Sequence, residues 1–179
     1  MRAAILLAVL LFVWAKAISA EGDVERAVKN ENIGTVRVTT PKDWAPIERH
    51  HINFGTTFYR LVPPKKNFNF EILFNDLAHM KMEALVDKDL EIYIESNMRR
   101  AAPQSIEGKA KAVRFGAKND GVYARLTDKA PKPGEPAYFT QGVRLLGKNV
   151  VLFTLYSDDK DGSVLTKALE IVDSVKVEK

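Results

Sequence analysis

Two neighbouring histidines are among the few side chains suited to chemistry. His50 and His51 could offer imidazole nitrogens to a divalent metal such as zinc or copper. Successive residues of a strand point to opposite faces, so shared ligation would require the pair to lie in a loop. The usual spacing of paired histidine ligands is absent, and a solvated polar loop between strands is the favoured interpretation.

A short acidic segment offers a second possible metal site. The segment from Ser157 to Gly162, which contains Asp158, Asp159 and Asp161, resembles the start of a calcium-binding loop. It has oxygen ligands at alternate positions from Ser157 and a glycine at the sharp turn. The twelfth position of such a loop should be a glutamate, but here it is Ala168. Carboxylates also stabilise the first turn of a helix by capping it and by interacting with its dipole. The sequence favours the start of a helix, with calcium binding as the alternative.

Catalytic motifs are missing from the sequence. It contains no G-x-S-x-G, no H-E-x-x-H and no glycine-rich phosphate loop. An acid–base scheme could combine His79 with Asp76, or Asp87 with Asp89, but such residues are also common on surfaces. Cysteine is absent, which excludes thiol nucleophiles, thiolate metal sites and disulfides. The sequence therefore favours a non-enzymatic role over a hydrolase, and no cofactor beyond a possible divalent metal is expected.

The first twenty residues have the composition of a secretory signal peptide. Arg2 precedes an apolar run over residues 3–15, and small residues precede Glu21. The apolar run ends at Lys16 and is shorter than the ~20 residues that a membrane-spanning helix needs. We expect cleavage after Ala20 and a periplasmic or secreted protein, without a membrane span and without the cysteine of a lipoprotein.

The remaining residues, 21–179, are predicted to form a single domain with little net charge. Loss of the two basic residues of the signal lowers the formal charge from +4 to +2. The basic residues do not alternate with aromatic ones as a nucleic-acid stacking surface requires. We therefore expect no nucleic-acid partner, and a monomeric protein.

The hydrophobic pattern predicts an α+β fold with a mainly antiparallel sheet. Residues 21–30 are expected to form a loose or short helical lead-in, and Trp44 to close one end of the core. Helices are predicted over residues 87–101 and from residue 163 onward. Strands are predicted over residues 35–40, 56–62, 68–74, 111–115, 122–127, 137–146 and 150–156.

This order of elements resembles the PsbP-like fold family, which includes periplasmic DcrB-like proteins. The resemblance lies in a strand followed by Pro41 and Trp44, and in a closing helix with the sequence ALEIVDSVKV. It extends over roughly residues 33–176. It implies a central, mainly antiparallel sheet flanked by helices, an αβα sandwich. It also implies accessory or partner-binding roles without a shared reaction. No functional residue is carried over from the family.

Irregular segments supply the expected contact surfaces. The proline-rich segment Lys129–Pro136 is predicted to be a loop long enough to meet a partner. Lys132 and Glu135 within it, and Trp44 at the start of the segment that reaches His51, are the expected contact residues. These features favour an exported accessory protein of the bacterial cell envelope that binds another envelope protein. A periplasmic metal- or small-ligand-binding protein is the alternative.

Overall fold

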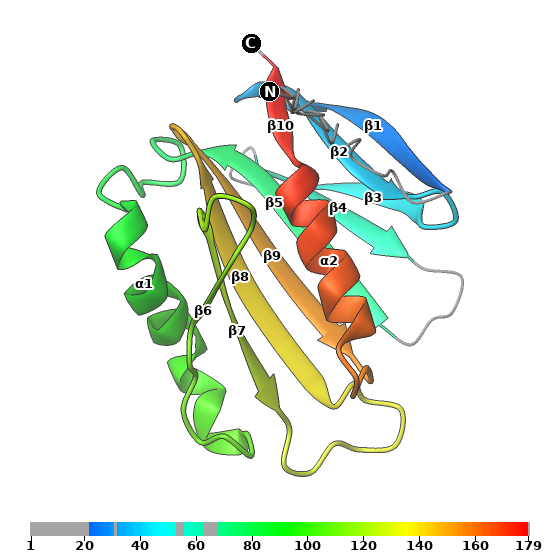
Figure 1. Ribbon diagram of the computed structural model, residues 1–179, viewed down its shortest axis with the longest axis vertical. Helices are drawn as coiled ribbons and strands as arrows, with labels where there is room; N and C mark the ends of the chain where they lie inside the picture. Colours follow the sequence, from blue (N-terminus) through cyan, green and yellow to red (C-terminus); the bar gives the residue numbers. More distant parts are fainter. Residues whose placement is uncertain (1–21, 31, 53–55, 63–67, 179) are drawn as a thin grey trace, which may run out of the picture.

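The computed structural model describes residues 22–30, 32–52, 56–62 and 68–178, and the predicted signal peptide lies outside these residues. The described chain forms two antiparallel sheets and two α-helices (Figure 1). The predicted α+β class is therefore confirmed.

The larger sheet has seven antiparallel strands in the order β3-β4-β5-β9-β8-β7-β6. At its centre, Phe70, Ile72 and Phe74 of β5 are buried on one face, as the alternation of apolar residues predicts. Gly147, with φ of 65°, lies in the turn that connects β8 to β9. The strands are β3 (Ala45–Ile52), β4 (Thr56–Val62), β5 (Phe68–Asp76), β6 (Val113–Phe115), β7 (Gly121–Thr127), β8 (Tyr138–Leu146) and β9 (Asn149–Ser157).

The smaller sheet joins the two ends of the described chain. It consists of β1 (Asp23–Asn30), β2 (Gly34–Pro41) and β10 (Lys176–Glu178), in the order β1-β2-β10. The expectation of a loose or helical lead-in over residues 21–30 is wrong, because β1 pairs with β2 along its whole length. Its polar sequence carries little strand signal, and pairing with the following strand β2 decides its conformation.

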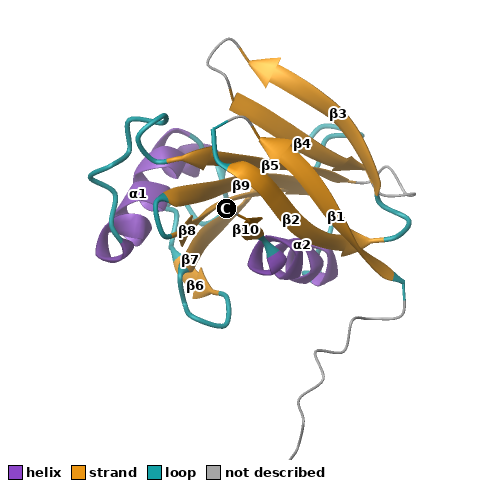
Figure 2. Ribbon diagram, turned by 90° about the horizontal axis from the view of Figure 1, so that it is seen from above, coloured by secondary structure: helices purple, strands orange, loops and turns teal. Residues whose placement is uncertain are grey.

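The two α-helices cover opposite faces of the larger sheet (Figure 2). Helix α1 (Leu90–Asn97) is extended by short 3-10 turns at both ends, so the helix predicted over residues 87–101 is confirmed in its position. It packs on β7 and β8. Helix α2 (Ser163–Ser174) packs on the other face, beside the smaller sheet. The predicted closing helix is wrong at its end, because Lys176–Glu178 pair with β2 as strand β10.

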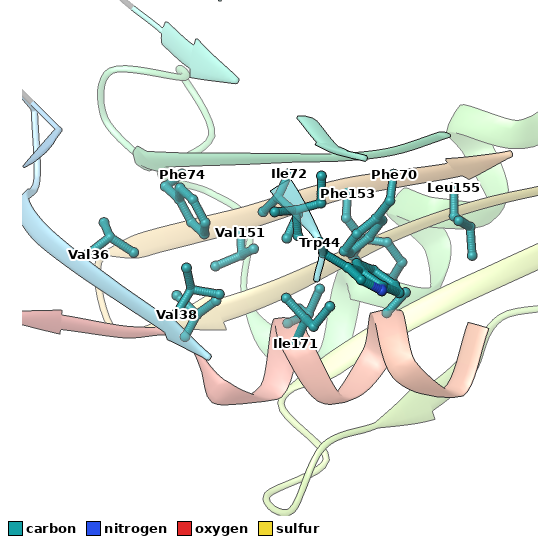
Figure 3. Packing of buried hydrophobic residues seen from close by; sticks show 14 of the residues in the cluster. Val36, Val38, Trp44, Phe70, Ile72, Phe74, Val151, Phe153, Leu155 and Ile171 are labelled. Carbon is teal, nitrogen blue, oxygen red and sulfur yellow. The ribbon is translucent and has the colours of Figure 1, made fainter. Parts of the chain in front are cut away.

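Each face of the sheet has its own apolar core. On the α1 side, Leu90, Ile94 and Met98 pack with residues of β7, β8 and β9. On the α2 side, a larger cluster joins α2, the smaller sheet and the β5–β9 pair (Figure 3). Trp44 belongs to this second cluster, with its ring centroid 4.9 Å from that of Phe68. The prediction that Trp44 closes the core is confirmed.

Within the described residues, no helix is both long enough and apolar enough to span a bilayer.

Candidate functional site

A pocket of about 280 Å³ lies between α1 and the strands β5, β9 and β8; we call it the α1 pocket. Leu73, Met80, Ile94 and Leu152 supply its apolar lining. The polar side chains that complete the lining come from four elements, Tyr93 and Asn97 from α1, Glu71 from β5, Thr154 from β9 and Gln141 from β8. An apolar cavity with a few polar groups around it is the usual form of a small-ligand site.

The strand register aligns the polar side chains in one row across the sheet. Gln141 pairs with Thr154, Thr154 with Glu71, and Glu71 with Arg60 of β4. Directly paired residues share a face of the sheet, so these four positions form a continuous polar row next to the apolar lining. We call it the polar row.

Most of the polar side chains in the pocket make no hydrogen bond to another described residue. This holds for Tyr93, Asn97, Gln141 and Thr154. Glu71 differs, because its Oε1 accepts hydrogen bonds from Arg60 Nη2 at 2.7 Å and Nε at 3.1 Å. The pocket thus offers unused amide and hydroxyl groups, whereas its carboxylate is already balanced by a guanidinium.

An aromatic pair lies beside the polar row. Phe139 and Tyr156 are directly paired across β8 and β9, and their rings stack with centroids 5.0 Å apart and an interplanar angle of 26°. Tyr156 is 40% exposed. Partial burial, and then the negative charge of Glu71, raise the pKa of the Tyr156 hydroxyl. On the other side of Tyr156, Asn69 of β5 has a buried Oδ1 without a hydrogen-bond donor.

A second, larger hollow of about 880 Å³ lies at the C-terminal end of α2. Arg144 is one of the residues that line it, and its side chain is 8% exposed. Arg144 forms ion pairs with Asp120 at 2.9 Å and Asp173 at 3.2 Å, and donates hydrogen bonds to the carbonyls of Val172 and Asp173 at the helix end. Because a cation there stabilises the helix C-terminus, these contacts explain Arg144 as a structural residue.

The two histidines lie in a strand, and the predicted polar loop around them is wrong. His50 and His51 belong to β3, where the backbone pairs them with Phe58 and Thr57 of β4. Adjacent strand positions belong to opposite faces, so the loop geometry required for sharing one metal ion is not formed. The side chains of this segment lie outside the described part of the structure.

The acidic segment is the start of a helix, as the favoured interpretation states. Asp159 accepts hydrogen bonds from the backbone N–H groups of Val164 at 2.8 Å and Leu165 at 3.2 Å. Asp161 accepts one from the N–H of Ser163, and hydrogen bonding with Asp159 and then with Ser163 lowers the pKa of Asp161.

The third carboxylate, Asp158, accepts a hydrogen bond from the N–H of Ala137. Among the described residues, no group of three or more histidine, aspartate or glutamate side chains is arranged to hold a metal ion.

The expected contact residues separate into one buried ring and one exposed pair. Trp44 is only 8% exposed because its ring packs in the apolar core on the α2 side. The prediction that Trp44 contacts a partner is therefore wrong. Lys132 and Glu135 lie in the exposed loop between β7 and β8, and their side chains approach to 3.7 Å.

The carboxylates considered for acid–base chemistry have structural partners. Asp87 pairs with Arg114 at 2.9 Å. Asp76 accepts a hydrogen bond from the N–H of Ala78. These contacts hold the ends of elements together.

Sequence reasoning did not identify the α1 pocket, because its residues come from four separate elements. A signal was present in β5, where Asn69 and Glu71 share the face opposite the phenylalanines. The same alternation recurs in β9, where Thr154 and Tyr156 follow Leu152 on one face.

No family model and no curated protein matches the chain. Among solved structures, it is similar to a crystal structure from Bacteroides thetaiotaomicron VPI-5482, with 15% identity and a TM-score of 0.45. The match covers 80% of this chain and 45% of that chain, so this chain spans less than half of the protein it matches.

Proposed function

We propose that the protein is an exported, non-enzymatic binding protein that holds a small uncharged ligand in the α1 pocket. The observation that carries this proposal is the convergence of unpaired amide and hydroxyl groups on an apolar lining. Polar groups of this kind fix the orientation of a ligand whose apolar part fills the cavity. Because Gln141 and Thr154 stand on central strands of a seven-stranded sheet, their positions are held before a ligand arrives.

Binding is favoured over catalysis by the chemistry of the lining. The carboxylate of Glu71 is paired with Arg60, and the unpaired groups are amides and hydroxyls. Such groups recognise a ligand through hydrogen bonds but are poor proton donors and acceptors near neutral pH. Export to the periplasm or beyond is supported by the composition of residues 1–20. A PsbP-like relationship is part of the proposal, supported by helices on both faces of an antiparallel sheet.

The proposal is tested with uncharged fragment-sized molecules and saturation-transfer NMR. We expect several fragments to bind the natural protein, and an Asn97→Leu, Gln141→Leu double variant to lose most of them. Gln104→Leu is the matched control, because Gln104 is exposed and lies outside the pocket. A ligand that binds only the folded state must also raise the melting temperature. Equal fragment binding by the natural protein and the double variant would contradict the proposal.

A second candidate function, binding of an envelope protein, is favoured by the loop between β7 and β8. All residues from Asp128 to Glu135 are exposed, and the loop is closed at its base by a hydrogen bond from the N–H of Asp128 to the carbonyl of Ala137. Deletion of residues 132–135 should weaken capture of a crosslinked partner in the cell envelope and leave the thermal melt nearly unchanged. If the shortened protein captures the partner equally well, this loop is not the contact surface.

A further inference from the structure

We infer that the ligand of the α1 pocket is a neutral saccharide, which extends from the pocket over the polar row onto the ring of Tyr156. This inference rests on the proposed function and names its ligand class. It is carried by the order of side chains on one face of β8, β9 and β5. Apolar, polar and aromatic positions follow one another along this face without interruption.

The register makes the three zones contiguous. Leu73 and Leu152 are paired at the apolar zone, Glu71 and Thr154 at the polar row, and Asn69 and Tyr156 at the aromatic zone. Residues two apart on a strand lie roughly 7 Å from each other on the same face. A molecule of two sugar rings or more could therefore contact all three zones at once.

The charge of the surface selects a neutral ligand. Arg60 and Glu71 are the charged side chains of the polar row, and they neutralise each other. The other polar groups of the pocket, Tyr93, Asn97, Gln141 and Thr154, are uncharged. A charged ligand would lose hydration here without meeting an unpaired opposite charge, which is unfavourable.

The hydrogen-bonding groups match a molecule that is rich in hydroxyls. The amides of Asn97 and Gln141 each offer both a donor and an acceptor, and a sugar hydroxyl also donates and accepts. A purely apolar ligand would leave these groups unsatisfied, at a cost for each one that is buried.

Tyr156 supplies the stacking surface. Its ring is fixed against Phe139, yet 40% of the residue remains exposed. The apolar C–H face of a sugar ring can pack on such a ring while its hydroxyls reach the polar row. An extended peptide is a poorer fit, because peptides are usually recognised by pairing with the edge of a sheet and this surface is the face of central strands.

The test uses the exported protein and defined probes in saturation-transfer NMR, followed by titration calorimetry. The neutral sugars are glucose, maltose, cellobiose, N-acetylglucosamine and chitobiose; glucuronate is the charged sugar, and phenol and indole are uncharged non-sugars. We expect at least one neutral sugar to bind. Tyr156→Ala and Gln141→Ala should each weaken this binding by about tenfold, whereas Tyr156→Phe should retain it.

Two control variants have the same residue types at other places. Tyr138→Ala changes a tyrosine of β8 whose ring contacts Arg125, and Gln104→Ala changes an exposed glutamine outside the pocket. Both should bind the sugar as the natural protein does. Tyr156→Phe keeps the inference testable if Tyr156→Ala does not fold.

The outcomes separate the inference from the proposed function. Binding of phenol or indole that depends on Gln141, without binding of any neutral sugar, would overturn the inference and leave the proposed function standing. Binding of glucuronate alone, or of a sugar with unchanged affinity in the Tyr156→Ala and Gln141→Ala variants, would also overturn it. Absence of binding by every probe would overturn both.

Discussion

Replacement of Arg144 by methionine should destabilise the protein strongly, because this guanidinium connects three elements. Its side chain is 8% exposed and contacts Asp120, Asp173 and the carbonyl of Val172. Removing one partner of a buried ion pair typically costs about 3–5 kcal/mol of unfolding free energy. The carboxylates of Asp120 and Asp173 are 23% and 33% exposed, so water would compensate them in part. We therefore expect a loss of about 3 kcal/mol, at the lower end of that range.

For a chain of this size, such a loss lowers the melting temperature by roughly 6–12 °C. Differential scanning calorimetry would measure it. Arg37→Met is the matched control, because Arg37 also pairs with two carboxylates, but on the exposed side of the smaller sheet. Solvent screens the ion pairs there, so the melting temperature of the Arg37→Met variant should hardly change. Adding Asp120→Asn to Arg144→Met should restore part of the stability, because it removes one uncompensated charge. A melting temperature lowered by less than about 3 °C in the single variant would refute the reasoning.

Two further predictions concern β8 and the loop before β6. Gly142→Ala would place a methyl carbon 2.2 Å from two ring carbons of Phe153 and 3.0 Å from the carbonyl oxygen of Val122. We therefore expect denaturant titrations to show a loss of roughly 1–3 kcal/mol of unfolding free energy. An unchanged denaturation midpoint would contradict this expectation. Partial burial acts to raise the pKa of Glu107, but hydrogen bonds from the N–H and hydroxyl of Thr127 outweigh it and lower the pKa below 4.5. This carboxylate therefore stabilises the fold above that pH and loses its contribution as the pH falls through the folded pKa. Glu107→Gln should accordingly be less stable than the natural protein at about pH 7, and the difference should shrink as the pH falls through the folded pKa of Glu107. A stability difference independent of pH would contradict the prediction.

The elements that could be predicted from the sequence are those whose signal is local. The alternation of phenylalanines and polar residues in β5, and the turn at Gly147 between β8 and β9, define strands within a few residues. The turn residues Asn119-Asp120-Gly121 likewise predict the pairing of β6 with β7, which the register confirms. Helix α2 was recognisable from its apolar stripe and from the carboxylates that cap it.

The elements that were missed have little local signal and take their conformation from the strands with which they pair. β10 pairs with β2, so that Lys176 lies opposite Arg37. β3 contains the run Glu48-Arg49-His50-His51, which has no apolar alternation, and its strand conformation comes with its pairing to β4. Strand propensity reflects the surface on which a segment packs, and a polar segment does not reveal that surface. For the same reason, a metal site based on the two histidines could not be judged from their spacing alone.

The α1 pocket follows from a mismatch between the width of one helix and the width of the larger sheet. A helix is about 10 Å across and strands are about 4.8 Å apart, so one helix covers about two strands. Helix α1 lies on β7 and β8, and the same face of β9, β5 and β4 therefore continues beyond it. If this part of the sheet face served only to stabilise the fold, its exposed positions would be uniformly polar. Instead, Tyr156 is exposed close to Gln141, whose amide has no hydrogen-bond partner among the described residues. Such an arrangement is better suited to recognising a ligand than to meeting water alone.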